Sequence, residues 1–326
     1  MKKILSLMLT AALFLTATTA CGGAPAASSA AAPSSAASSE VSSAASSEAA
    51  SSAAASSEAA SSAAASAAPV SGSITASGSS ALYPLVKDAI AKFKGNNPDA
   101  SITLNAGGSG TGLKQVSDGT VDIGNSDVTA ESKLTADKAK ALVDHKVCVI
   151  TMAPVVNPDV AKTVKSLTAA QLADIFTAKT KSWKEVGGPD EPIVLVTRPS
   201  TSGTRALFKQ YALNGAQEAS NKSLETDDSG TLLQSVAQHK GAIGYVALSY
   251  LVNNTSVSTV AIDGVEPTLA NTYSGKYKVW GYEHMYTKGE AKGVAKALID
   301  YMSSDAYATS IETLGYNVTA KMQVTR

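Results

Sequence analysis

The chain has 326 residues, of which 44% are hydrophobic and 17% charged, and its formal net charge at pH 7 is zero. This length is sufficient for two medium domains with cores of their own. The balanced charge does not indicate nucleic acid binding or electrostatic attraction to a membrane surface, so we expect no nucleic acid partner.

Residues 1–20 have the layout of a secretory signal peptide. Two lysines precede an apolar run over residues 4–15, and small residues then lead to Cys21. The run is too short and wrongly flanked for a membrane-spanning helix. Small residues directly before a cysteine are typical of a bacterial lipoprotein signal, so we predict that Cys21 becomes the lipidated N-terminus. Thr18 departs from that pattern, and the alternative is an ordinary cleavage site followed by a stray cysteine.

Residues 21–70 are predicted to be a disordered tether. From Ala24 to Val70 the chain is almost entirely serine and alanine, with a few prolines and glutamates. Such a composition has too little apolar bulk to offset the entropy lost on ordering. Its repeats of the ASSEAASSAAA kind carry no hydrophobic face that could stack, so they are low complexity rather than a solenoid.

Residues 71–326 form the globular body, which has 25 basic and 24 acidic side chains. Cys148 is the only cysteine of the body, so no disulfide can form within it. It lies in the apolar run VCVITMAPVV, which indicates a buried core thiol. No histidine motif accompanies it, and we therefore expect no catalytic cysteine.

Predicted strands and helices alternate along this body. The strands cover residues 73–80, 101–110, 121–127, 147–156 and 192–198, and the helices cover residues 81–94, 113–119, 131–142, 168–176 and 204–213. Alternation of this kind predicts an α/β fold with mainly parallel sheets flanked by helices.

Loops rich in hydroxyls and glycine follow four of these strands. They are residues 78–80, 107–112, 125–127 and 198–204, and three of them are expected to open a helix. In parallel sheets, ligands bind at the carboxyl ends of the strands, beside the helix N-termini. Backbone N–H groups at a helix start attract anions, and glycine allows a close approach. We therefore predict that the four loops converge on one small, highly charged anion.

The stretch RPSTSGTRALF, residues 198–208, places Arg198, several hydroxyls and Gly203 directly before a predicted helix. An arginine beside a helix start is suited to an anion. The alternative is that Ser202 or Thr204 only caps the helix, as Ser and Thr before an apolar run usually do. This stretch by itself leaves both interpretations open.

The tripeptide Ser-Gly-Thr begins at Ser109, Ser202 and Ser229. The third copy follows Asp227 and Asp228, whose charges would repel an anion. Ser229 is therefore predicted to be a plain helix cap outside the site.

The same loops resemble catalytic motifs but lack residues that those motifs require. Residues 107–112 have the spacing of a nucleotide-binding P-loop, but Leu113 occupies the position that requires lysine. Ser109 lacks the second glycine of a nucleophile elbow, because Thr111 is in that place. None of the three histidines has a metal-ligand spacing, so we expect them at the surface or at helix ends, and we expect no metal or other cofactor.

Five segments in a fixed order resemble a known family: SGSSALYPL, GGSGTGL, DIGNSD, RPSTSGTR and GAIGYV. Behind a lipoprotein signal, this set is similar to the phosphate-binding proteins of bacterial phosphate ABC transporters, the PstS family. The resemblance covers the body from Ile74 to the C-terminal helices. It implies a two-lobed periplasmic-binding-protein fold whose lobes close by a hinge over a buried phosphate.

By this resemblance, the phosphate contacts fall in the loops described above. They are Ser79, Ser80, Ala81, Ser109, Gly110, Asp127, Arg198, Ser202, Gly203 and Thr204. Arg205 matches a recurrent arginine of the family motif, and a scaffold role and a ligand role both stay open for it. Asp127 on sequence alone would be a turn or helix cap, but an ionised carboxylate can also accept the hydrogen bond of a protonated phosphate.

The connectivity of the family implies that residues 71–155 and 242–326 form lobe I and that residues 156–241 form lobe II. The phosphate would then bridge the two lobes.

Two functions stay in view. The first is a monomeric solute receptor, anchored by a lipid on Cys21 at the outer face of the cytoplasmic membrane, that captures inorganic phosphate and delivers it to the permease subunits of a phosphate ABC transporter. The second is a secreted phosphoryl-transfer or phosphoester-hydrolysing enzyme with the same anion pocket. It would need a metal cluster or an activated nucleophile, and the sequence indicates neither. We therefore expect a binding protein rather than an enzyme.

Overall fold

The computed structural model describes residues 68–219 and 224–326. The predicted signal peptide, Cys21 and the predicted tether up to residue 67 lie outside the described residues. The first elements of the body alternate as predicted: β1 (Gly72–Gly78), α1 (Tyr83–Asn96), β2 (Ala100–Ala106), α2 (Ser109–Asp118) and β3 (Ile123–Ser126).

The chain continues with two short helices and one long strand in place of the single helix predicted over residues 131–142. These are η1 (Ala130–Ser132), α3 (Ala136–Lys140) and β4 (Leu142–Val156). The next elements are α4 (Pro158–Ala161), β5 (Ser166–Leu167), α5 (Ala169–Phe176), η2 (Trp183–Val186), β6 (Val194–Thr197), α6 (Gly203–Tyr211), β7 (Leu224–Glu225), α7 (Ser229–Gln238) and β8 (Ala242–Ala247). The last are η4 (Leu248–Tyr250), β9 (Ser258–Thr259), β10 (Ala261–Ile262), α8 (Leu269–Tyr273), β11 (Trp280–Lys288), α9 (Gly293–Met302), α10 (Asp305–Thr313) and η5 (Thr319–Lys321).

Nine of these strands form one sheet, in the order β2-β1-β3-β11-β4-β8-β6-β7, with β9 paired to β4. The outer strands pair in parallel, β1 with β2 and β3, and β6 with β7 and β8. The central pairs β3–β11, β11–β4 and β4–β8 are antiparallel. The predicted α/β class is confirmed, and the antiparallel centre is an addition that the alternation pattern did not indicate.

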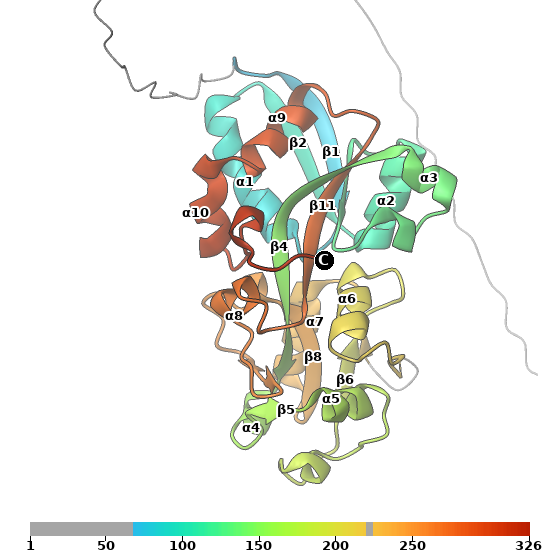
Figure 1. The fold of residues 1–326 in the computed structure, drawn as a ribbon, viewed down its shortest axis with the longest axis vertical. Coiled ribbons are helices and arrows are strands. Elements are labelled where there is room, and N and C mark those ends of the chain that lie inside the picture. The colour runs from blue at the N-terminus through green and yellow to red at the C-terminus, as the bar shows by residue number, and fades with distance from the viewer. Residues whose placement is uncertain (1–67, 220–223) are drawn as a thin grey trace, which may run out of the picture. The chain divides into compact units, whose positions relative to one another are not determined.

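Strand β4 joins two halves of this sheet (Figure 1). Its residues 142–151 pair with β11, next to β3, β1 and β2, and this part is the first half. Its residues 152–156 pair with β8, next to β6 and β7, and this part is the second half. One continuous strand therefore runs through both halves.

Strand β8, which begins at residue 242, pairs with strands of the second half of the sheet. Strand β8 pairs with β6 and β4, and β10 pairs with β5. Tyr245 of β8 stacks on Phe208 of α6, with ring centroids 4.1 Å apart. Pairing with β3 is first resumed by β11. The partners of β8 lie far away in sequence, so the local pattern of AIGYV does not specify them.

Each half has a hydrophobic core of its own. In the first half, α1, α9 and α10 pack on one side of the sheet and α2 packs on the other (Figure 1). Cys148 is a free, fully buried thiol in the core beneath α1 and α9, as the sequence predicts. In the second half, α5 and α6 cover a core that includes Phe176, Phe208 and Tyr245.

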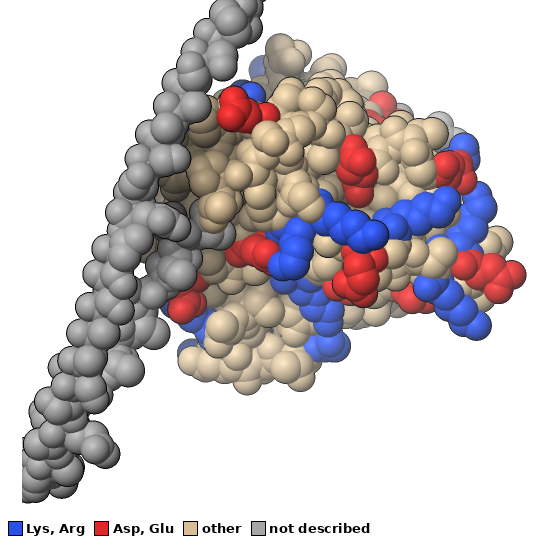
Figure 2. Space-filling model, turned by 90° about the horizontal axis from the view of Figure 1, so that it is seen from above, with Lys and Arg blue, Asp and Glu red and all other residues tan. Residues whose placement is uncertain are grey.

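The surface of the protein carries charged side chains of both signs. On the face shown in Figure 2, Lys and Arg side chains form a row with Asp and Glu side chains on both sides.

Two of the histidines differ in their exposure. His239 is exposed at the end of α7, as expected, but His284 is buried on β11, with Nδ1 2.7 Å from Oδ1 of Asp144. No helix in the described part of the chain is long and apolar enough to cross a membrane.

Candidate anion-binding site

The four predicted loops meet where the two halves of the sheet adjoin. Three of them follow β1, β2 and β3 in the first half, and the fourth joins β6 to α6 in the second. The structure brings the ten predicted ligand residues together, with Gly110 half-buried and the others buried. The buried ones are Ser79, Ser80, Ala81, Ser109, Asp127, Arg198, Ser202, Gly203 and Thr204.

Asp127 is the point where three of these loops meet. Its Oδ1 accepts a hydrogen bond from the Ser79 hydroxyl, and its Oδ2 accepts one from Thr204 Oγ1 at 2.8 Å. Its backbone N–H donates to Ser109 Oγ at 3.0 Å. A carboxylate has about four acceptor positions, so Asp127 can still accept from a ligand.

Arg198 brings a buried positive charge to the same region. Its side chain is fully buried, Nη1 donates to Ser80 Oγ at 3.3 Å, and Nη2 donates to Ser229 Oγ at 2.6 Å. Nε has no acceptor. Among the described residues, no carboxylate forms an ion pair with Arg198, and the arginine ion pairs there belong to Arg205. A buried charge without a partner in contact is costly, which makes this place favourable for an anion.

The N-termini of α2 and α6 lie close together because each carries a glycine. The Gly110 N–H donates to the carbonyl oxygen of Thr201 at 3.0 Å. A Cβ on Gly203 would overlap Oγ of Ser109 and lie 2.8 Å from its Cβ. Two helix starts, whose first N–H groups have no partner within their own helix and whose dipole ends are positive, therefore face one small region.

Ser202 and Thr204, the two candidate caps of α6, have different roles. Ser202 is the cap, since its Oγ accepts from the Arg205 N–H at 3.3 Å. Thr204 instead donates across to Asp127. The same stretch therefore supplies both a helix cap, Ser202, and a member of the buried cluster, Thr204.

The prediction that Ser229 is a plain helix cap is wrong. Asp228 caps α7 by accepting from the Thr231 N–H at 2.7 Å, and the fully buried Ser229 hydroxyl contacts Arg198 and Ser80. The Asp227 carbonyl oxygen also accepts from Arg198 at 3.3 Å. The signal was the third Ser-Gly-Thr itself, which the neighbouring aspartates led us to discount.

Two tyrosines hold the backbone of the first loop. Tyr250 donates to the Ser80 carbonyl oxygen at 2.7 Å, and Tyr316 donates to the Ala81 carbonyl oxygen at 2.5 Å. Both come from segments far along the chain, and the sequence did not single them out. With its carbonyl groups held in this way, the loop is positioned from outside the site.

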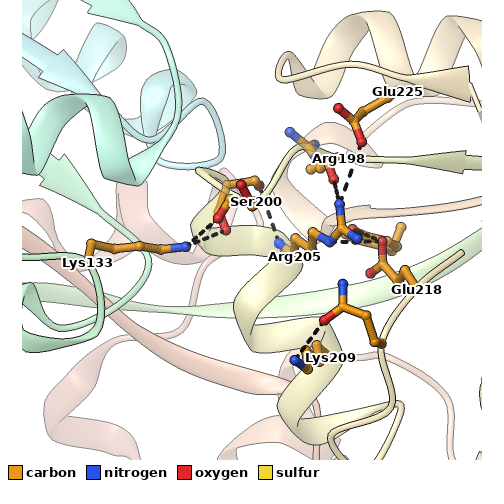
Figure 3. Close-up of polar contacts among 10 residues, drawn as sticks. Lys133, Arg198, Ser200, Arg205, Lys209, Glu218 and Glu225 are labelled. Carbon is orange, nitrogen blue, oxygen red and sulfur yellow. Dashed lines mark hydrogen bonds and ion pairs between the residues drawn. The ribbon is translucent and has the colours of Figure 1, made fainter. Parts of the chain in front are cut away.

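Arg205 lies between the backbone of Arg198 and the side chain of Glu218 (Figure 3). Its Nη1 donates to the Arg198 carbonyl oxygen, and its Nε lies 3.4 Å from Oε2 of Glu218. Nη1 also lies 3.6 Å from Oε2 of Glu225. Burial raises the pKa of Glu218 to about 7, against the lowering effect of the Arg205 charge. These contacts favour the scaffold role that the sequence left open.

Lys133 crosses from the first half to the second (Figure 3). Its Nζ donates to the carbonyl oxygens of Ser200 at 2.7 Å and Ser202 at 3.4 Å. Burial lowers its pKa, and the nearby carboxylate of Asp127 opposes that effect. No motif marked this lysine in the sequence.

The structure shows no arrangement for metal chemistry here. In residues 68–219 and 224–326, no group of three or more His, Cys, Asp or Glu side chains could hold a metal ion. Lys114, next to the failed P-loop lysine position, is exposed and lies 3.8 Å from Asp118. The cluster consists instead of hydroxyls, backbone N–H groups, the guanidinium of Arg198 and the carboxylate of Asp127, with the carboxylate of Asp227 beside Gly108.

Comparison with known proteins agrees with this arrangement. Residues 63–306 match the model of the PBP superfamily domain. The chain is 52% identical over 257 residues to the phosphate-binding protein PstS of Bacillus subtilis, covering 78% of this chain and 84% of that protein. This chain belongs to the PstS family.

Two solved structures are also similar to this chain. A phosphate ABC transporter substrate-binding protein from Clostridium perfringens, solved with bound phosphate, is 31% identical, with a TM-score of 0.69 over 76% of this chain and 99% of that one. An ABC-type phosphate transport receptor from Vibrio cholerae, 24% identical with a TM-score of 0.59 over 76% of this chain and 99% of that one, shares the fold. The predicted family and its two-lobed α/β architecture are thereby confirmed.

Proposed function

We propose that this chain binds inorganic phosphate outside the cytoplasm and delivers it to the permease of a phosphate ABC transporter. Its PstS relatives and the phosphate-bound structure from Clostridium perfringens support the ligand. The observation that carries the proposal is Arg198, a fully buried guanidinium that lies amid hydroxyls and two helix N-termini and whose Nε has no acceptor among the described residues. Phosphate is a dianion or monoanion with oxygens that suit such donors.

The proposed contacts divide into donors and one acceptor. The proposed donors are the hydroxyls of Ser80, Ser109 and Ser202, the N–H groups of Ala81, Gly203 and Thr204, and the guanidinium of Arg198. Ser79 and Gly110 would line the site, because the Ser79 hydroxyl donates to Asp127 and the Gly110 N–H donates to the Thr201 carbonyl oxygen. Asp127 is the proposed acceptor for the proton that phosphate keeps at neutral pH. Ser229, in contact with both Arg198 and Ser80, is an additional candidate donor.

We further propose that the two halves of the sheet are lobes that open and close about β4 and β11. Lobe I would then be residues 68–151 and 280–326, and lobe II residues 152–279, which modifies the boundary expected from the sequence. The contacts of Asp127 with Thr204 and of Lys133 with Ser200 support a closed arrangement. Hinge closure around a ligand is common in periplasmic binding proteins.

The extracytoplasmic setting is supported by the PstS relatives. We propose that the protein is a monomer, without enzymatic activity, held at the outer face of the membrane by a lipid on Cys21 and a tether over residues 21–70. Delivery to permease subunits would take place from there.

Calorimetric titration of the purified protein with phosphate, sulfate, arsenate and molybdate tests the proposal. We expect tight binding of phosphate and much weaker binding of sulfate. A parallel incubation with a chromogenic phosphate ester, after metal removal and after metal readdition, should show no turnover. Failure to bind phosphate would overturn the receptor function, and metal-dependent turnover would favour the enzyme alternative.

A further inference from the structure

Glu283 is a fully buried carboxyl group on β11. Neither of its two oxygens has a hydrogen-bond partner with ordinary geometry in the described part of the chain. A buried carboxylate with no partner is among the most costly groups in a protein interior, and a protonated carboxyl avoids most of that cost. Nothing in the proposed phosphate contacts uses this group.

Strand pairing places Glu283 beside Asp127. In the antiparallel pair of β11 with β3, His284 is opposite Ser126, so Glu283 and Asp127 are neighbours one residue further along. On the other side of β11, Glu283 is opposite Cys148 of β4. Glu283 therefore lies directly behind the carboxylate at which three loops of the site meet.

In the part of the chain that the structure describes, the titratable groups around Glu283 supply no positive charge. They are Asp127 from the loop after β3, Cys148 from β4 and Tyr316 from the segment after α10. His284 follows Glu283 in the chain, and its ring contacts Asp144. Burial first, and then the charge of Asp127 and a side-chain contact with it, raise the pKa of Glu283 well above its ordinary value.

The acceptor positions of Asp127 limit what such a neutral acid can do. The carboxylate of Asp127 has about four acceptor positions. The hydroxyls of Ser79 and Thr204 occupy two of them. A proton donated by Glu283 would occupy a third and leave one for a ligand that carries a hydrogen.

We propose that Glu283 is a neutral positioning residue that donates a hydrogen bond to Asp127 and so leaves it a single acceptor position for the ligand. This inference rests on the proposed function, because it assumes that Asp127 accepts from phosphate. Through Asp127, Glu283 would determine both phosphate affinity and the rejection of anions without a proton. The Glu283–Asp127 pair would carry one negative charge between them.

Infrared difference spectroscopy and phosphate calorimetry on the wild type, Glu283→Gln and Glu283→Leu test this inference. We expect a protonated-carboxyl C=O band at neutral pH that disappears in Glu283→Gln and shifts in the wild type when phosphate is added. Glu283→Leu should weaken phosphate binding about tenfold or more, because it removes a donor to a charged acceptor. Glu283→Gln, which keeps an uncharged donor, should recover most of that loss.

Glu290→Gln, at an exposed position just after β11, is the matched control and should retain both the band and the affinity. If the wild type binds phosphate but has no protonated-carboxyl band that disappears in Glu283→Gln, the positioning role of Glu283 is overturned and the proposed function is not. Equal affinity of the folded Gln and Leu variants, with folding verified by thermal melts, would also overturn it. A wild type that binds no phosphate would overturn the proposed function and the positioning role together.

Discussion

Arg198 is the residue whose energetics depend most on the ligand. Its charge is buried, and its guanidinium contacts Ser80 and Ser229, which are uncharged. Arg198→Ala should therefore weaken phosphate binding by about 2 to 5 kcal/mol, as for truncation of one partner of a buried charge pair. Arg198→Lys should recover only part of this, because an ammonium cannot reproduce the planar fork.

Calorimetric titration of these variants with phosphate measures the loss. Lys179→Ala is a suitable control, since it removes one positive charge from a side chain in the second half that is 72% exposed. It should bind phosphate like the wild type. Near-native affinity in Arg198→Ala would remove the arginine from the ligand contacts.

Substitution of Asp127 tests how the site discriminates between phosphate and sulfate. An ionised carboxylate can accept the proton of phosphate, whereas sulfate would bring an unprotonated oxygen and a like charge against it. Sites built around one buried hydrogen bond reject an analogue that lacks it by ~10⁴ or more. Asp127→Asn introduces a hydrogen-bond donor. It should therefore reduce the preference for phosphate over sulfate, mainly because sulfate binds more tightly. Competition titrations of the wild type and Asp127→Asn with phosphate and sulfate measure this preference. An unchanged ratio of the two affinities would contradict the prediction.

At the scale of elements, the start of α6 has to fit closely against the start of α2. Gly203→Ala would place a methyl group on Ser109, with Cβ atoms 2.8 Å apart, so α6 could not approach α2 as it does now. We expect at least a tenfold loss of phosphate affinity, on the order of 1.4 kcal/mol, with little loss of thermal stability, because alanine is a better helix former than glycine.

Gly95→Ala is the matched control for this prediction. Gly95 lies in α1 with no atom within 4 Å of an added Cβ, so the change should leave phosphate affinity intact. Melting curves and phosphate titrations of both variants supply the comparison. Unchanged affinity in Gly203→Ala would mean that binding does not need this close approach.

At the scale of the whole molecule, the proposed lipid anchor concerns the segment outside the described residues. Cys21→Ser should move the protein from the membrane fraction to the soluble fraction, while phosphate binding by the body stays intact. Firm attachment needs two membrane-binding signals, such as two acyl chains, because a single chain binds only marginally. Cys148→Ala, at the buried thiol of the body, should leave the protein in the membrane fraction. A Cys21→Ser protein that stays in the membrane fraction after a high-salt wash would contradict the anchor.

The sequence by itself determined the class of the fold and predicted which residues gather at the candidate site. Both depend on local pattern: strands alternate with helices, and loops rich in Ser, Thr and Gly follow the strands in a recognisable order. The ten predicted ligand residues accordingly lie together in the structure, with all but Gly110 buried.

Only the tertiary structure decided the features that depend on partners far apart in the chain. Strand β4 pairs with β11 over one stretch and with β8 over the next, which determines where the second half ends. The contact of Ser229 with Arg198 joins the start of α7 to the end of β6, and the position of Glu283 behind Asp127 follows from the pairing of β11 with β3. A local sequence pattern specifies which face of a strand is apolar but not which strand lies beside it, because that choice is made by packing of the whole sheet.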